Sequence, residues 1–333
     1  TFTVTDAAGL IAALATATMA GCAKPHEWQG GWVGAAHARG HRLKGGDVPA
    51  AAVQRLGCDG ERAPERTVVV SGIGCSSRFP HYMKTYGFHG IHGRAFPLAE
   101  GVKMARPDLH VFVNTGDGDC CSIGAAHWIH AIRYNMNLTV ILHDNHVYGL
   151  TKKQASPTSP VGLKSNTTPR GAVLEALNPL TVTLGVQNAS FVAQGVDWMP
   201  EQLYDIVRRA FHHRGFSFIR IVQRCPEFLP KMFEPWLHDP GKTLVLTHGN
   251  GLQPSAEVSR IYRNQREHDP LDLNAAREIA SVEDPIPVGI LYHNPEVPCY
   301  EDLRGAGAPR SPELTRAGLD AELDKYTIWP EAA

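Results

Sequence analysis

Residues Thr115–Gln154 read TGDGDCCSIGAAHWIHAIRYNMNLTVILHDNHVYGLTKKQ, a pattern that predicts a glycine turn, a helix, a buried strand and then a polar loop. Asp117 lies in the turn between Gly116 and Gly118, and Asn145 follows the second strand. The 28 positions between them (145 minus 117) suit one helical crossover between parallel strands. Both side chains should therefore meet at the carboxyl edge of the sheet, where two oxygen ligands can hold one Mg²⁺. A Mg²⁺ there would bridge to phosphates, so the stretch predicts a diphosphate cofactor site.

Short apolar runs alternate with helical spacing on both sides of this stretch. The predicted strands are 67–70, 110–113, 138–142, 190–193 and 216–222, and the predicted helices are about 97–105, 122–134 and 200–213. This alternation is typical of an α/β fold in which helices cover both faces of a parallel sheet. Ligands of such a sheet bind beyond the carboxyl ends of its strands.

Further blocks of sequence narrow the interpretation. They are VSGIGCSSR at 70–78, TYGFH at 85–89, HGRA at 92–95, YGLTK at 148–152 and QASPT at 154–158. Together with the GDG turn and Asn145, which resemble the thiamine diphosphate motif, these blocks resemble the β subunit of 2-oxoacid:ferredoxin oxidoreductases. The 2-oxoglutarate type is the most similar version. The resemblance spans about residues 66–230 and implies a thiamine diphosphate-binding fold.

The resemblance also implies an activity. Such a subunit takes part in the oxidative decarboxylation of a 2-oxoacid, here 2-oxoglutarate by expectation, to an acyl-CoA and CO₂ through a thiamine diphosphate adduct. Electrons leave by a [4Fe–4S] cluster to a ferredoxin. The glutamate that activates thiamine belongs to another subunit in this family, so we expect an α subunit as partner and a dimer of αβ pairs. Two alternatives stay open: a non-redox thiamine diphosphate decarboxylase or carboligase subunit, and a scaffold that binds the cofactor without doing chemistry.

The matching positions give a predicted cofactor site. Mg²⁺ would be held by Asp117, Asn145 and the backbone carbonyl of Val147. The residues expected at the cofactor are Gly74, Cys75, Ser76, His92, Gly93, Gly116, Asp117, Gly118, Asp119, Asn145, Val147, Tyr148, Gly149, Leu150 and Thr151.

Three residues are candidates for catalysis. Lys152 matches a lysine of the family and could hold a substrate carboxylate, although a pair of adjacent lysines is commonly a solvated surface feature. Arg78 could bind the same carboxylate through two parallel hydrogen bonds, or could pair with a nearby acid. His92 could contact the diphosphate or the reactive ring, or could be structural. Lys153 stands where the family usually has glycine, so no role is assigned to it.

The cysteines bear on electron transfer. The resemblance places two cluster ligands at Cys75 and Cys225, and thiolates are the donors that such clusters prefer. If both bind one cluster, their sulfurs should lie on the order of 6–7 Å apart, because each would bind an iron at about 2.3 Å, as a thiolate binds zinc. The family's remaining ligands come from an early C-x-x-C, which this sequence lacks. The motif could precede Thr1, the cluster could be lost, or Cys22 and Cys58 could substitute; ordinary buried thiols are the simplest alternative.

Composition excludes several classes of protein. The net charge of −1 over 333 residues gives no argument for nucleic acid, and no apolar run is long enough to cross a membrane. Seven scattered cysteines make a poor disulfide framework and favour a reduced, cytoplasmic setting. We expect a cofactor domain over 1–230, with a helix over 7–19 and an insertion at about 24–66. Residues 231–333 should form an extended arm that wraps a partner subunit, with helices near 257–263 and 312–323.

Overall fold

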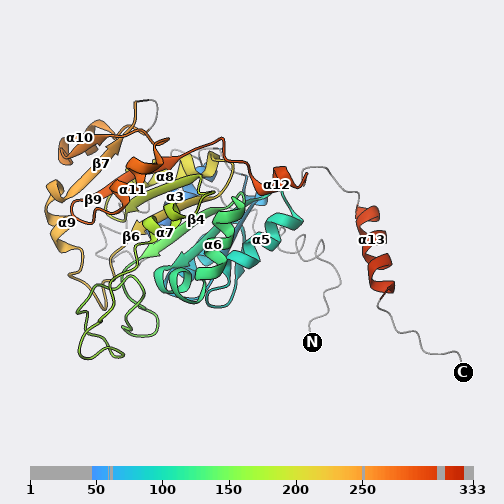
Figure 1. The fold of residues 1–333 in the computed structure, drawn as a ribbon, viewed down its shortest axis with the longest axis horizontal. Coiled ribbons are helices and arrows are strands. Elements are labelled where there is room, and N and C mark those ends of the chain that lie inside the picture. Colours follow the sequence, from blue (N-terminus) through green and yellow to red (C-terminus); the bar gives the residue numbers. More distant parts are fainter. Residues whose placement is uncertain (1–46, 59, 61–62, 250–251, 306–311, 326–333) are drawn as a thin grey trace, which may run out of the picture.

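The computed structural model describes residues 47–58, 60, 63–249, 252–305 and 312–325. Within these residues nine strands form one sheet in the order β2-β1-β3-β4-β6-β5-β9-β7-β8 (Figure 1). The strands are β1 (Thr67–Ser71), β2 (Tyr86–His89), β3 (His110–Gly116), β4 (Thr139–Asp144), β5 (Phe191–Val196), β6 (Ser217–Val222), β7 (Thr243–Thr247), β8 (Gln265–Glu267) and β9 (Ile286–His293). The helices are α3 (Asp47–Cys58), α4 (Phe79–Tyr82), α5 (Ala95–Ala105), α6 (Ala125–Tyr134), α7 (Pro179–Gly185), α8 (Pro200–His212), α9 (Glu234–His238), α10 (Ala256–Ile261), α11 (Leu273–Ala280), α12 (Tyr300–Leu303) and α13 (Pro312–Asp324).

The predicted parallel α/β fold is confirmed. Strands β2, β1, β3, β4, β6 and β5 are neighbours in that order and run parallel. The five predicted strands correspond to β1, β3, β4, β5 and β6, and the three predicted helices to α5, α6 and α8. Every residue of β4 and β5 is buried, as expected for parallel strands that are covered on both faces.

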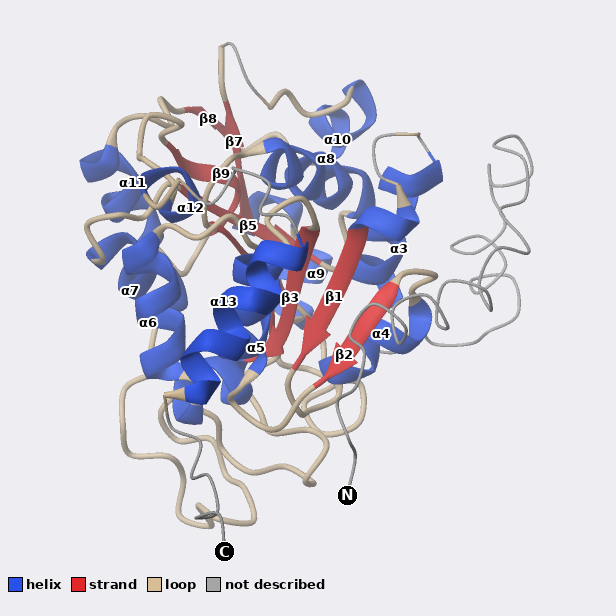
Figure 2. Ribbon diagram, turned by 90° about the vertical axis from the view of Figure 1, so that its right-hand side faces the viewer, coloured by secondary structure: helices blue, strands red, loops and turns tan. Residues whose placement is uncertain are grey.

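Helices cover the two faces of this sheet as separate layers (Figure 2). Alternate residues of β1 show the division: Val68 and Val70 pack in one apolar cluster, and Val69 packs in the other. The first cluster includes residues of α5, α6, α7 and α11, and the second includes residues of α3, α4 and α8. Among the described residues no helix combines the length and apolar character needed to cross a membrane.

The expectation of an extended arm is wrong for residues 243–293. Strand β9 pairs antiparallel with β5, and β7 and β8 continue the sheet beyond it. Val245 and Val288 are fully buried in the core. This segment needs no core of its own, because it extends a sheet that already has one. The predicted helices near 257–263 and 312–323 correspond to α10 and α13, and contact of this region with a partner stays a proposal.

Part of the predicted insertion is also structural. Helix α3 lies within the 24–66 segment, and Val53 and Leu56 on it are fully buried against residues of α8. This end of the segment is therefore part of the core and not a surface excursion. The predicted helix over 7–19, most of the insertion and Cys22 lie outside the described residues, as does the side chain of Cys58.

A buried histidine makes the stability of this fold depend on pH. His213 is 6% exposed, and burial, with neighbouring His293, lowers its pKa to about 3. The unfolded chain binds a proton below its pKa of about 6.5 while the folded chain does not, so stability is lost as pH falls below that value. The free energy of unfolding falls by about 1.4 kcal/mol for each pH unit below this value. At pH 5 the fall amounts to about 2 kcal/mol.

His213→Gln should therefore reduce the loss of unfolding free energy between pH 7.5 and pH 5 by about 2 kcal/mol. Urea unfolding at the two values measures it. His212→Gln, at the exposed neighbouring position, is the matched control and should keep the wild-type pH dependence. Equal pH dependence in wild type and His213→Gln would contradict the prediction. Other titrating groups are common to the variants and cancel in the comparison.

Candidate functional site

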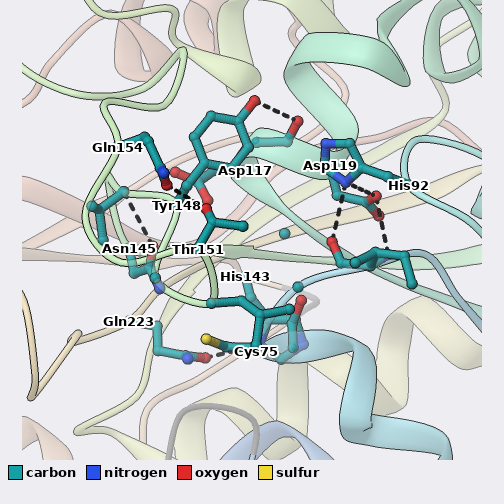
Figure 3. Close-up of a pocket in the computed structure, with 18 residues that line it drawn as sticks. Cys75, His92, Asp117, Asp119, His143, Asn145, Tyr148, Thr151, Gln154 and Gln223 are labelled. Atoms are coloured by element: carbon teal, nitrogen blue, oxygen red, sulfur yellow. Dashed lines mark hydrogen bonds and ion pairs between the residues drawn. The ribbon is translucent and has the colours of Figure 1, made fainter. Parts of the chain in front are cut away.

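A cavity of about 500 Å³ lies at the carboxyl edge of the parallel strands (Figure 3). Its walls come from the segments that follow β1, β2, β3, β4 and β6, as expected for an open α/β sheet. The lining residues are Ile73, Gly74, Cys75, Ser76, His92, Gly116, Asp117, Gly118, Asp119, His143, Asn145, Val147, Tyr148, Gly149, Leu150, Thr151, Gln154 and Gln223. Every residue predicted at the cofactor lines this cavity except Gly93, whose backbone N–H holds Asp119 instead.

Asp117 is a buried acid with an unusual electrostatic setting. It is 4% exposed, and burial, followed by the charge of neighbouring Asp144, raises its pKa to about 7. Ser156 and Thr158 donate to the same carboxylate oxygen, Oδ2, at 2.6 and 2.8 Å. A divalent cation would offset the cost of ionising Asp117 in this position.

The residues present fit Mg²⁺. Asn145 and Val147 line the same cavity as Asp117, and Asn145 Oδ1 accepts from the Val147 N–H at 3.2 Å, so the segment turns back on itself. His146, between them, has a φ of 60°, in the left-handed region that permits this turn. Carboxylate, amide and carbonyl oxygens suit a hard cation. Groups of three or more His, Cys, Asp or Glu side chains that could hold a metal are absent from the described residues, and the Mg²⁺ set does not need one because two of its ligands are amide and carbonyl oxygens.

Asp119 holds the walls of the cavity together. Its Oδ1 accepts from the backbone N–H groups of Ile73 and Gly93 at 3.2 and 2.6 Å, and its Oδ2 accepts from Thr115 at 2.8 Å. His92 Nδ1 lies 3.0 Å from Oδ1 and 3.2 Å from the carbonyl oxygen of Ile73. Both partners are acceptors, so Nδ1 carries a proton.

The GDG turn is glycine-rich for reasons of space. Neither Gly116 nor Gly118 is among the residues with positive φ. A β-carbon on Gly118 would lie 2.0 Å from the ring of Tyr148, whose hydroxyl donates to the Gly118 carbonyl at 3.2 Å. Gly118 therefore lets the 148–154 loop close over the turn.

Cys75 and Cys225 approach each other beside this loop. A β-carbon built on Gly149 would lie 3.2 Å from Sγ of Cys75 and 3.8 Å from Sγ of Cys225. The two sulfurs can therefore be no farther apart than the sum of these distances, 7.0 Å. Cys75 is exposed and lines the cavity, and Cys225 is buried. This upper bound allows the separation expected for two ligands of one cluster, and ligation stays a prediction.

The two proposed carboxylate-binding residues do not line the cavity. Lys152 is exposed on the loop just beyond Thr151, with a φ of 71°, and its N–H donates to the carbonyl of Gly149. Arg78 is exposed at the end of a short helical turn, Ser76–Arg78, and its charge acts to lower the pKa of Cys75 against the larger effect of burial. Both residues lie close in sequence to cavity residues, but neither lines the cavity itself. Their roles in binding the substrate carboxylate therefore stay predictions.

Four lining residues were not predicted from the sequence: Ile73, His143, Gln154 and Gln223. His143 is fully enclosed between Gln223, at 2.8 Å, and Asn114, at 2.5 Å, and burial lowers its pKa to about 4. A polar residue at the end of a buried strand is the signal that could have found it. Ile73 and Gln154 lie in the blocks VSGIGCSSR and QASPT, but neither stands at the end of a strand. Loop shape brings them to the cavity.

Comparisons with known proteins agree with this arrangement. Residues 72–221 match the family described as thiamine pyrophosphate enzyme, C-terminal TPP binding domain. Residues 258–306 match the family that describes the C-terminal part of the pyruvate ferredoxin oxidoreductase beta subunit. The second match falls in the region that extends the sheet.

Individual relatives are similar over most of the chain. The 2-oxoglutarate oxidoreductase subunit KorB of Mycobacterium tuberculosis is 40% identical over 267 residues, 79% of this chain and 69% of the relative. The 2-oxoacid:ferredoxin oxidoreductase subunit beta of a Sulfolobus species is 37% identical, over 80% of this chain and 84% of the relative. A solved structure of 2-oxoglutarate:ferredoxin oxidoreductase from Magnetococcus marinus, with 2-oxoglutarate, coenzyme A and succinyl-CoA bound, has a TM-score of 0.68 and 32% identity, covering 82% of this chain and 89% of that one.

Proposed function

This chain belongs to the β subunits of 2-oxoacid:ferredoxin oxidoreductases, and from that premise we propose that it serves, with an α subunit, in the CoA-dependent oxidative decarboxylation of 2-oxoglutarate. The observation that carries the proposal is one cavity lined by Asp117, Asn145 and Val147 on one side and by Cys75 near Cys225 on the other. The predicted Mg²⁺ ligands and Cys75 thus lie around the same cavity, with Cys225 close to Cys75.

The chain's residues would divide the work as follows. Asp117, Asn145 and the Val147 carbonyl would hold Mg²⁺ and through it the diphosphate. When bound, thiamine diphosphate supplies the nucleophilic carbon that attacks a 2-oxo group and accepts the electrons left by decarboxylation. His92 would present Nε2 to the cavity as a proton acceptor. Asp119 would keep His92 and the surrounding backbone in place.

Cys75 and Cys225 are the proposed ligands of a [4Fe–4S] cluster, which would pass electrons to a ferredoxin. Their separation of at most 7.0 Å supports this over two unrelated core thiols. The other ligands, Cys22 and Cys58 among the candidates, stay a prediction. We further propose that the α subunit supplies the activating glutamate and that the complex is a dimer of αβ pairs.

The relatives support 2-oxoglutarate as the substrate. The M. tuberculosis relative carries that substrate in its name, and the M. marinus structure contains it together with coenzyme A and succinyl-CoA. Arg78 and Lys152 beside the cavity are the candidates on this chain for binding a carboxylate of the substrate.

The test is substrate-dependent reduction of a viologen dye by the copurified complex, with CoA, across pyruvate, 2-oxoglutarate, branched and aryl 2-oxoacids. We expect 2-oxoglutarate to give the highest kcat/KM. Another preferred 2-oxoacid would overturn the substrate assignment alone. Decarboxylation without dye reduction would favour the non-redox decarboxylase or carboligase.

Lys152→Ala should lower kcat/KM for 2-oxoglutarate by about ten- to hundred-fold, because it removes a charge-assisted hydrogen bond worth roughly 1.5–3 kcal/mol. Steady-state kinetics of the intact complex measure it. Lys153→Ala is the matched control, since it removes an equal charge from a backbone with the same φ of 71°. An unaltered kcat/KM in Lys152→Ala would leave Arg78 as the candidate.

A further inference from the structure

Thr158 joins two buried acids that the chain brings together from different segments. Its hydroxyl lies 2.8 Å from Oδ2 of Asp117 and 2.8 Å from Oδ1 of Asp144. All three residues are at most 4% exposed, and both contacts of the hydroxyl are direct. Thr158 comes from the long loop between β4 and α7, whereas Asp144 ends β4 and Asp117 follows β3. The contact is therefore a tertiary one and not a local turn.

The two acids differ in whether a described cationic side chain lies beside them. Asp144 Oδ2 accepts from Nε and lies 2.7 Å from Nη2 of Arg220, which in turn donates to Gln194 at 3.1 Å. Asp117 has no such cation beside it among the described residues: its side-chain donors, Ser156 and Thr158, both meet Oδ2. Among the described residues no side chain donates to its other oxygen, Oδ1, which is therefore the oxygen we assign to the metal.

We propose that Thr158 is a positioning residue for the metal ligand Asp117. Its hydroxyl ties Oδ2 of Asp117 to the Asp144–Arg220 ion pair and so directs Oδ1 toward the cation. A single hydroxyl proton serves two carboxylate oxygens, so the arrangement holds best when a cation shares the charge of Asp117. The inference deepens the proposed function and rests on it, since the ligand is Mg²⁺ with thiamine diphosphate.

Thr158→Val keeps the shape of the side chain and removes the hydroxyl. In the copurified complex, stripped of cofactor by a chelator, titration with Mg²⁺ at fixed thiamine diphosphate should show binding weakened about ten- to hundred-fold, the loss of one hydrogen bond to a charged group. Thr158→Ser should restore affinity to within a few-fold, because it keeps the hydroxyl. Thr168→Val, the same change in the same loop where the hydroxyl donates to the Leu163 carbonyl, is the control and should bind as wild type.

The outcomes separate the inference from the proposed function. If wild type binds Mg²⁺ with thiamine diphosphate and Thr158→Val binds equally well, the positioning role is wrong. If wild type does not bind, the proposed function itself fails. A merely structural role predicts that the weakened binding disappears when Mg²⁺ is titrated well below the melting temperature of the Thr158→Val complex. We expect the weakening to persist there, because it comes from the lost hydroxyl and not from unfolding.

Discussion

Asp117→Ala should yield a folded complex that no longer retains thiamine diphosphate. The substitution removes the one anionic ligand of the proposed Mg²⁺ set, and a hard cation depends on that charge. Loss of a group that merely supports a ligand typically costs 10–100-fold in affinity, so we expect loss of the ligand itself to exceed roughly 100-fold. Thiamine diphosphate and magnesium contents of the purified complex measure it, and unchanged contents would contradict the metal assignment.

The same position offers a control for folding. Asp117→Asn keeps the shape of the side chain and one oxygen that can accept from Ser156 and Thr158, while it removes the charge. In the stripped complex it should melt no lower than wild type, because the ionised form of Asp117 is opposed by burial and by Asp144. Loss of cofactor in both variants at an unchanged melting temperature would assign the effect to the metal site and not to unfolding.

The parallel half of the fold was predictable because its strands are regular. Strands β1, β3, β4, β5 and β6 are buried apolar runs separated by helices of ordinary length. The edge strands were not predictable: β2 and β8 are short and mostly exposed, so they lack apolar runs. Strand β9 is buried along most of its length but contains Pro287 and Gly289, both disfavoured in strands. Gly289 has a φ of 141°, and a β-carbon there would lie 2.8 Å from Leu246, so packing against β7 requires the glycine.

The candidate site was predictable where a strand end fixes a residue and less so where a loop does. Asp117 and Asn145 follow strands, and both line the cavity. The partners of Asp117 lie 39 and 41 positions away, in a loop whose path no periodicity encodes. Lys152 and Arg78 lie in blocks of sequence that resemble the family. Their position beside the cavity depends on loop shape, which the sequence pattern does not predict.

The two halves of the chain are also coupled through polar side chains. Arg220 joins Asp144, next to the proposed metal site, to Gln194, and Gln194 donates to the carbonyl of Pro287 at 2.7 Å. The C-terminal strands therefore reach the cofactor edge through one buried relay. An extended arm could not do so, and a truncation before β9 should disturb the site as well as the sheet.

Cys225→Ser should remove the cluster while leaving thiamine diphosphate bound. Serine keeps the size of the side chain but is a poor ligand for iron, because clusters are held by soft thiolates. We expect the complex to lose the broad visible absorption of iron–sulfur proteins, most of its iron and nearly all 2-oxoglutarate-dependent viologen reduction. Cys75→Ser should behave alike, since the two sulfurs lie within 7.0 Å of each other. Cys299→Ser is the matched control, because its buried thiol donates to Glu301 and does not line the cavity. Iron content and absorption equal to wild type in Cys225→Ser would remove the cluster from this wall and leave the non-redox thiamine enzyme as the better interpretation.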